Sequence, residues 1–278
     1  MRSWKYILAT LALAALSVWL GVFGSKDKNL HLIACDVGQG DAILVSLGNQ
    51  QILTDAGPDN SVLDCLAKYL PFWDREIEVV ILTHPQLDHY GGLVEVLNRY
   101  KVDTLLVRDF EISTSNLQAL KKAIGGSQAR LIKPVKGLVI RLGMIYLDIL
   151  HPSEEFQSSE INEESVVYRL RKGDFEALLT GDIGKEATEK MLQEGLLTDV
   201  DYIKIPHHGS RNGLTLELLK AANPEVVVIS AGKNNAYGHP HQEVLKMLKD
   251  RDIKILRTDQ MGNIEIVSDG KSFWQGSD

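Results

Sequence analysis

Three side chains that can bind a metal ion lie within six residues of one another in the segment Thr83–Gly92. They are His84, Asp88 and His89, and they follow an apolar run, Glu78–Leu82, that is typical of a buried strand. Imidazole and carboxylate groups together suit zinc, manganese or iron. The alternative is structural, with surface histidines and an aspartate that caps the next helix. The spacing favours a metal site.

Further histidines and one aspartate also stand just beyond predicted strands. These residues are Asp182, His207, His208 and His239. Asp182 also suits a cap for a helix that begins near Gly184. Of the adjacent histidines, one can bind metal while the other faces substrate as a general acid, or both are ordinary loop residues. His241 can simply flank its helix, and we expect His31 and His151 to be structural. Six of the eight histidines therefore gather in three loops, which favours one shared site.

The segments that position these residues form two blocks, each with strands followed by helices. The first block has predicted strands at Leu30–Val37, Asp41–Leu47, Gln51–Thr54, Glu78–Leu82 and Thr104–Val107, and helices at Ser61–Tyr69, Gly92–Tyr100 and Ser115–Ile124. The second has strands at Leu138–Leu150, Ser165–Arg171, Phe175–Leu179, Tyr202–Ile205, Glu225–Ala231, Ile253–Arg257, Asn263–Val267 and Ser272–Trp274, and helices at Gly184–Glu194, Thr215–Ala222 and His241–Asp250. Two such blocks predict an α/β fold in which two sheets pack face to face with helices outside, a four-layer αββα sandwich.

A doubly wound parallel sheet is the alternative fold. Its dinucleotide-binding form is excluded at Gly38-Gln39-Gly40, because the third glycine of that fingerprint is missing and the following residues, Ala42–Leu47, form a strand pattern rather than a helix.

The composition excludes several classes of protein. With 278 residues, of which 44% are hydrophobic, the chain can bury a core and is not intrinsically disordered. Its net charge of −7 gives no general basic footprint for nucleic acid, so phosphate chemistry must be organised locally. Cys35 and Cys65 are too few for a disulfide framework or a cysteine-rich zinc site, and we expect them to be unpaired.

The N-terminus has the pattern of a targeting or anchoring segment. Arg2 and Lys5 precede an uncharged run, Tyr6–Ser25, of about the length that a helix needs to cross a bilayer. We expect residues 1–29 to be an uncleaved membrane anchor or a cleaved signal peptide, rather than a core helix, and residues 30–278 to form one folded domain. The basic flank places that domain outside the cytoplasmic membrane.

Six motifs in order carry a resemblance to a known family. They are Asp36-Val37-Gly38-Gln39-Gly40-Asp41, Thr54-Asp55-Ala56-Gly57, His84 to Gly92, Thr180-Gly181-Asp182, His207-His208-Gly209-Ser210 and Gly238-His239-Pro240. Between Leu30 and about Val267 the chain resembles the metallo-β-lactamase fold hydrolases, and more narrowly the soluble hydrolase domain of the DNA-uptake competence protein ComEC and its stand-alone relatives. The superfamily includes lactamases, thioesterases, lactonases, nucleases and phosphodiesterases, so the motifs specify the family better than the substrate.

The resemblance implies a set of metal ligands. His84, Asp88 and His89 fall on the first metal motif of the superfamily, His-x-His-x-Asp-His, with Gln86 in place of its second histidine. Asp182 falls on the carboxylate that usually bridges two metals, and the later ligand comes from His207, His208 or His239. A further superfamily histidine is absent where the chain has Asn162-Glu163-Glu164-Ser165. One or two ions of Zn²⁺ or Mn²⁺ are implied, or else a decayed site.

The resemblance also implies a mechanism and partners. An ion between Asp88, His89 and Asp182 would lower the pKa of its water from about 16 toward 7 and provide hydroxide as the nucleophile. His208 or Arg211 would support the developing charge or protonate the leaving oxygen, and Ser210 would bind a phosphate oxygen or make a local turn bond.

The implied substrate is DNA or another phosphodiester, and a separate membrane channel is a potential partner, because a chain with at most one span cannot form a channel. The alternatives are hydrolysis of a small lactam, lactone or thioester, and a catalytically silent binding module tethered to the membrane.

Overall fold

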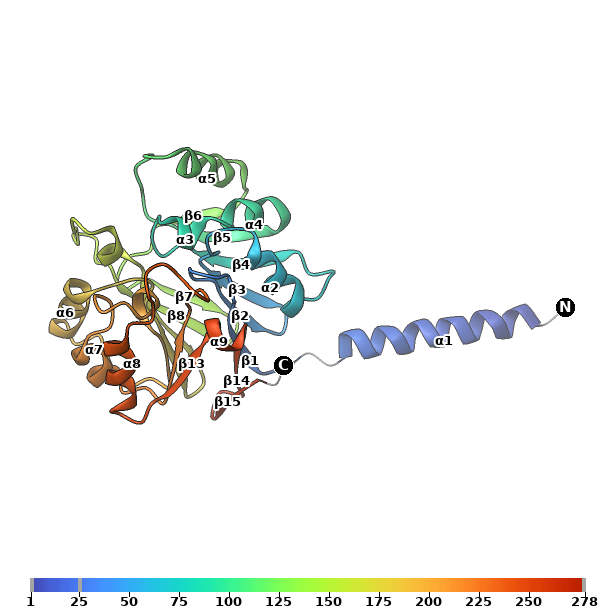
Figure 1. Cartoon of the computed structure of the whole chain (residues 1–278). Helices are drawn as coiled ribbons and strands as arrows, with labels where there is room; N and C mark the ends of the chain where they lie inside the picture. Colours follow the sequence, from blue (N-terminus) through green and yellow to red (C-terminus); the bar gives the residue numbers. More distant parts are fainter. Residues whose placement is uncertain (1–2, 25–26, 277–278) are drawn as a thin grey trace.

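The computed structural model describes residues 3–24 and 27–276 of the chain. Helix α1 (Ser3–Gly24) extends away from the rest of the molecule in Figure 1, and the side chains of residues 4–17 are exposed. Across the described residues, no helix combines the length and apolarity needed to span a membrane. Arg2 and Ser25, at the ends of the predicted targeting segment, lie outside the described residues, and the anchor or signal peptide stays a prediction.

Two sheets form the centre of the fold. The larger sheet has eight strands in the order β15-β14-β1-β2-β3-β4-β5-β6. Their bounds are β1 Leu30–Ala34, β2 Ile43–Leu47, β3 Gln50–Thr54, β4 Glu76–Ile81, β5 Lys101–Leu106, β6 Arg130–Ile132, β14 Ile264–Ser268 and β15 Phe273–Gln275. The smaller sheet has seven strands in the order β13-β12-β11-β10-β9-β8-β7. Their bounds are β7 Val139–Leu142, β8 Ile145–His151, β9 Val167–Lys172, β10 Phe175–Leu179, β11 Tyr202–Lys204, β12 Val226–Ile229 and β13 Lys254–Arg257.

The central strands are apolar on both faces because each sheet lies between two apolar layers. In β12, Val226 and Val228 face the core between the two sheets, whereas Val227 and Ile229 face the helices outside. Successive strand residues point to opposite sides, so a strand covered on both faces has no polar alternation.

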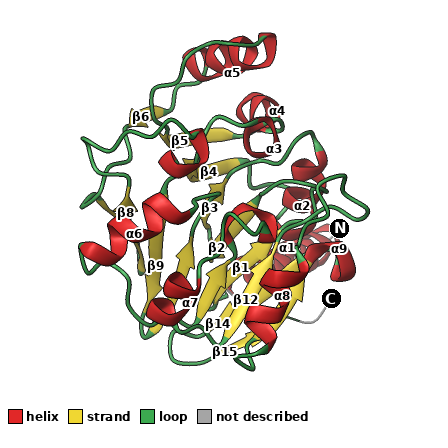
Figure 2. Ribbon diagram, turned by 60° about the vertical axis from the view of Figure 1, so that its left-hand side comes forward, coloured by secondary structure: helices red, strands yellow, loops and turns green. Residues whose placement is uncertain are grey.

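Helices cover the outer face of each sheet, as Figures 1 and 2 show. Helices α2 (Ser61–Tyr69), α4 (Leu93–Arg99) and α5 (Ser115–Gly126) pack on the larger sheet. Helices α6 (Lys185–Gln193), α7 (Leu216–Ala222) and α8 (Gln242–Lys249) pack on the smaller one. The predicted four-layer αββα sandwich is confirmed, and the doubly wound alternative is wrong.

The boundaries differ from the predicted ones where a turn or a short edge strand has little pattern. The predicted run Leu138–Leu150 is two antiparallel strands, β7 and β8, joined by a turn in which Gly143 has a φ of +58°. Strand β6 was not predicted, because its three residues lie at the sheet edge and two of them are exposed. Short helical segments α3 (Leu87–Tyr90), α9 (Thr258–Met261), η1 (Ile161–Glu164) and η2 (Pro206–Gly209) were also missed.

Cys35 and Cys65 form a disulfide, so the expectation of unpaired cysteines was wrong. Cys35 follows the end of β1 and Cys65 lies on the buried face of α2, which packs over the same sheet. The packing brings residues 30 positions apart to a Cα–Cα distance of 5.8 Å. Two cysteines give no spacing pattern that would show this pairing.

Replacing both cysteines with alanine is expected to lower the free energy of unfolding by about 3 to 4 kcal/mol, because the disulfide closes a loop of about 30 residues in the unfolded chain. Urea denaturation of the oxidised protein and of the double variant measures the difference. Adding dithiothreitol should lower the stability of the natural protein and leave that of the variant unchanged. Equal stability of the two proteins would contradict the prediction.

Candidate metal centre

Four side chains that can bind a metal ion meet at one edge of the sandwich: Asp88, His89, Asp182 and His208. One ligand atom of each lies within 4.8 Å of the others. His208 Nε2 is 3.3 Å from both Asp88 Oδ2 and Asp182 Oδ2, and His89 Nε2 is 3.3 Å from Asp182 Oδ2. All four were among the predicted site residues, and of the three candidates for the later histidine ligand the structure brings His208 to the other three.

Strand ends explain why residues so far apart in the chain meet here. Parallel strands β3 and β4 of one sheet run into Asp55 and His84, and parallel strands β10 and β11 of the other run toward Asp182 and His208. Since the carboxyl ends of parallel strands share one edge, the loops that follow them lie together. Asp88 and His89 sit on α3, in the loop after β4.

The buried atoms of this cluster fit a cation. The side chains of His89, Asp182 and His208 are at most 1% exposed, whereas that of Asp88 is 31% exposed. Among the described residues, His89 Nε2, both carboxylate oxygens of Asp182 and His208 Nε2 have no hydrogen-bond partner. Buried polar atoms are normally paired, and unpaired carboxylates are especially costly. Two imidazole nitrogens and two carboxylates are a donor set that binds divalent zinc or manganese.

The second ring nitrogen of each histidine is held by the surrounding fold. His89 Nδ1 is 2.8 Å from Asp55 Oδ2, and Asp55 also accepts hydrogen bonds from the backbone N–H and hydroxyl of Thr83. His208 Nδ1 lies 3.1 Å from the carbonyl oxygen of Ser230, which can only accept, so this nitrogen carries the proton. Both rings therefore present Nε2 to the cluster, which is the usual arrangement around a bound metal.

A buried lysine sits behind the metal ligands. Lys204 is 2% exposed, forms an ion pair with the buried Asp41, and its Nζ is 3.9 Å from Asp182 Oδ1. Although burial opposes ionisation, Lys204 and His208 hold the pKa of Asp41 below its ordinary value. Asp41 belongs to the first of the six motifs, and no role was predicted for Lys204.

The pKa values of the metal-free cluster follow from the same contacts. Burial disfavours the charged form of His89 and His208, but the carboxylates around them outweigh it and raise both pKa values. Asp182 responds in the opposite direction, because the two imidazoles lower its pKa in spite of burial. The cluster is thus an interdependent set of charges.

Gln86 and Asn162, from the two places where the chain lacks a superfamily histidine, contact each other. Gln86 Nε2 donates a hydrogen bond of 2.5 Å to Asn162 Oδ1, and Asn162 Nδ2 is 3.5 Å from His207 Nδ1. His84 is buried nearby, with its ring centroid 4.2 Å from that of His89 and with Nε2 unpartnered among the described atoms. Burial lowers the pKa of His84 to about 3, so its ring is neutral.

The remaining predicted residues lie around the cluster rather than in it. His239 is half-buried, with its ring stacked at 6.3 Å from that of His208, and His207 is 5.7 Å from His239 between ring centroids. Ser210 is buried, and its hydroxyl accepts a hydrogen bond from the backbone N–H of Asn212, a local turn bond. Arg211 is exposed and approaches Glu243 at 3.8 Å.

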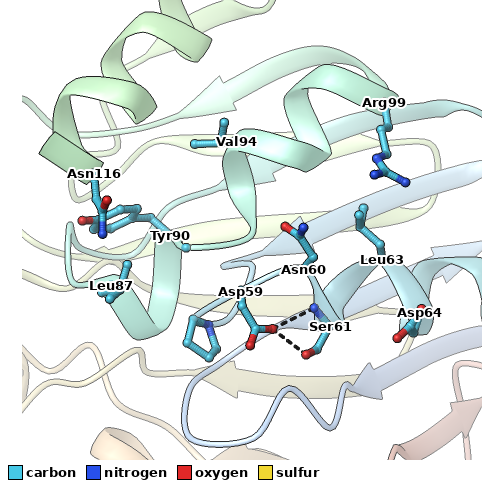
Figure 3. A pocket seen from close by; sticks show the side chains of 12 residues that line it. Asp59, Asn60, Ser61, Leu63, Asp64, Leu87, Tyr90, Val94, Arg99 and Asn116 are labelled. Carbon is cyan, nitrogen blue, oxygen red and sulfur yellow. Dashed lines mark hydrogen bonds between the residues drawn. The ribbon is translucent and has the colours of Figure 1, made fainter.

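A separate hollow lies between α2, α3 and α4, with a volume of about 800 Å³ (Figure 3). Its lining carboxylate Asp59 accepts hydrogen bonds from the backbone N–H and hydroxyl of Ser61, which Figure 3 draws as dashed lines. No histidine is among the described residues that line it, so the predicted metal-binding side chains lie at the strand ends and not in this hollow.

Comparison with known protein families shows to which family the chain belongs. Residues 35–233, more than half of the chain, match the Metallo-beta-lactamase superfamily. The chain belongs to the metallo-beta-lactamase superfamily. ComE operon protein 3 of Bacillus subtilis is 29% identical over 259 residues, which cover 87% of this chain and 33% of that protein. Competence protein ComA of Neisseria gonorrhoeae is 27% identical over 237 residues, covering 83% and 31%.

This metallo-beta-lactamase chain thus spans about a third of the length of those curated relatives. Among solved structures, the metallo-beta-lactamase fold protein YhfI from Bacillus subtilis superposes with a TM-score of 0.58 at 14% identity, covering 90% of this chain and 100% of that one. At that identity the likeness shows the shared fold. The superfamily hydrolase fold and the His/Asp cluster agree with a metal-dependent hydrolase.

His151 is outside the metal centre. Its Nε2 donates a 2.7 Å hydrogen bond to the Glu163 carbonyl, and its ring packs against Phe156 at 4.4 Å between centroids. Burial lowers its pKa from 6.5 to about 4, Arg108 also lowers it, and the Glu163 carbonyl and more weakly Glu194 and Glu164 oppose this.

We expect this histidine to make the fold sensitive to acid. Below pH 6.5 the unfolded chain binds a proton at His151 that the folded chain does not accept until about pH 4, so unfolding becomes easier as the pH falls through this window. The loss attributable to His151 is about 3 kcal/mol. Urea denaturation between pH 7.5 and 4 should give a shallower decline for His151→Gln than for the natural protein. Parallel pH profiles would show that His151 does not contribute.

Proposed function

We propose that this protein is a metal-dependent phosphodiesterase that cleaves DNA. One observation carries the proposal: two imidazole and two carboxylate groups converge on one point, with buried ligand atoms that have no hydrogen-bond partner among the described residues. The competence name of one relative, Competence protein ComA, supports DNA as the substrate.

The charges of the site explain why cleavage requires a cation. Asp41, Asp55, Asp88 and Asp182 bring four carboxylates together, which the Lys204 ammonium group and the imidazoles of His89 and His208, with their raised pKa values, do not fully balance. Without a cation this arrangement repels a phosphodiester. A bound divalent ion supplies activation of water and neutralisation of the phosphate oxygens.

The chain's own residues hold and orient the reacting groups. His89 is fixed by Asp55, and His208 by the Ser230 carbonyl, so neither ring has to reorganise. Asp88 has the largest exposed fraction of the four ligands, at 31%, and therefore lies on the side that substrate and water approach. The buried cluster is otherwise closed to solvent.

We further propose a single tightly bound ion. Gln86 and Asn162 satisfy each other at the position where the superfamily has two more histidines. Amide groups engaged in a hydrogen bond with each other are poor ligands for a second transition-metal ion. The proposed ion is Zn²⁺ or Mn²⁺.

The proposal also includes a location outside the cytoplasm, either anchored or secreted through the N-terminal segment, and a membrane channel as a partner. The Cys35–Cys65 disulfide supports this location, since disulfides persist in oxidising compartments.

The test is cleavage of end-labelled single-stranded and double-stranded DNA by the full chain, with manganese or zinc added. Asp88→Ala is the inactive comparison, and Asp64→Ala, an exposed aspartate of α2 outside the metal cluster, is the matched control. We expect metal-dependent cleavage by the natural protein and the control and none by Asp88→Ala. If the natural protein binds metal and cuts no DNA, hydrolysis of a small lactam, lactone or thioester replaces the proposal. If it binds no metal, a silent binding module does.

A further inference from the structure

A second cavity, of about 360 Å³, borders the metal centre at His84. It lies between the segment after β5, which contains Arg108 and Phe110, and the segment before β9, which contains Ser158, Ile161 and Glu164. His84 lines this cavity, while its ring packs against the metal ligand His89. A group held in the cavity is therefore next to a group held at the metal centre.

The guanidinium group of Arg108 lines the cavity, and the protein does not provide hydrogen-bond acceptors for all of its N–H groups. Arg108 is 16% exposed, and its Nη2 is 3.5 Å from Glu164 Oε2. Its Nη1 is buried and has no hydrogen-bond partner among the described residues. Glu164 is itself fixed, because its other carboxylate oxygen accepts a hydrogen bond from the backbone N–H of Ser158.

The charges of the lining disfavour an anionic occupant. Asp109, Glu111 and Glu164 accompany Arg108 in the wall, so carboxylates outnumber the cation. A phosphate or a carboxylate would be repelled by three of these four groups. The remaining surface is largely apolar, from residues such as Leu82, Val107, Leu117 and the partly buried Phe110. The cavity suits a flat, neutral group that carries both donors and acceptors.

We infer that this cavity binds one nucleobase of the substrate strand, beside the phosphate that is cleaved. The inference rests on the proposed function. The Arg108 guanidinium group donates to a ring nitrogen or carbonyl of the base, the Glu164 carboxylate accepts from an exocyclic amine, and Phe110 and Ile161 provide the apolar contact. The volume is at the small end for ligand pockets, so it holds one base and not a base pair. The base must be unpaired to enter, which makes single strands and frayed ends the preferred substrates.

The test uses the full chain with manganese and a set of single-stranded oligonucleotides, each with one abasic residue at a different position. We compare the natural protein with Arg108→Met and Phe110→Ala, two separate changes in the cavity. Arg99→Met is the matched control, because Arg99 is 57% exposed and pairs with Glu95 outside this cavity. Equilibrium dialysis with manganese and thermal unfolding establish that each variant is folded and binds the ion.

For the natural protein, we expect cleavage next to one particular abasic position to slow by about tenfold in kcat/KM. Arg108→Met should slow cleavage of intact DNA by a similar factor and cause little further loss on that abasic substrate, because both changes remove the same contact. Arg99→Met should behave as the natural protein does.

The outcomes separate this inference from the proposed function. If the natural protein cleaves no oligonucleotide, the proposed function fails and the nucleobase site fails with it. If it cleaves intact and abasic strands equally well, only the nucleobase site is overturned. The nucleobase site would also be overturned if the loss of kcat/KM caused by Arg108→Met and the loss caused by the abasic residue multiply. Independent losses would mean that Arg108 contacts the phosphate or has a purely structural role.

Discussion

Asp182→Asn is expected to weaken binding of Mn²⁺ and Zn²⁺ by about a hundredfold or more and to abolish hydrolysis. Even residues that only support metal ligands change affinity by about tenfold to a hundredfold, and Asp182 is placed to be a ligand itself. Its Oδ2 is 3.3 Å from both His89 Nε2 and His208 Nε2, so its charge lies at the centre of the cluster. Asparagine keeps the size and one oxygen but removes the charge.

Calorimetric titration of the metal-free proteins measures this loss directly and does not depend on knowing the substrate. Asp59→Asn is the matched control, because Asp59 lines the separate cavity between α2, α3 and α4 and hydrogen-bonds Ser61 there (Figure 3). The control should bind metal as the natural protein does. If Asp182→Asn retains the natural affinity, the ion is held elsewhere and the assignment of the metal centre is wrong.

The local part of the site could be predicted from the sequence. Asp88 and His89 are adjacent in one loop and reach the cluster together, whereas His84 of the same loop packs against His89 outside it. Asp182 and His208 are predictable in a weaker sense, since each follows an apolar strand and strand ends share an edge. The choice among His207, His208 and His239 depends on which ring the turn buries, and His207 and His208 both have positive φ values there.

The contacts that the sequence did not reveal all join distant segments. The Cys35–Cys65 disulfide and the Gln86–Asn162 hydrogen bond need the packing of separate elements. Asp55 belongs to the motif Thr54-Asp55-Ala56-Gly57, and only the structure shows its contact with His89. The fold itself was easier to predict, because strands such as β12 have an apolar pattern that can be recognised without knowing which strands lie beside them.

Lys204→Met is expected to lower the free energy of unfolding of the metal-free protein by about 3 to 5 kcal/mol, because it leaves Asp41 buried and charged with the His208 ring, at 3.4 Å, in place of a close ammonium group. Asp41 and Lys204 are each at most 3% exposed, so water cannot replace the lost contact. Asp41→Asn alone should also destabilise the fold, since among the described residues it leaves the ammonium group with Asp182, at 3.9 Å, as its one remaining carboxylate.

The double variant Lys204→Met, Asp41→Asn should be more stable than the sum of the single changes predicts, because it removes both charges together. Urea denaturation of the four proteins gives the coupling energy, and additive losses would show that the two charges do not stabilise each other. The same cycle repeated with manganese present tests whether the pair also positions Asp182. If it does, each single variant loses metal affinity as well as stability, because Asp182, the second carboxylate beside Lys204, lies between the two imidazoles.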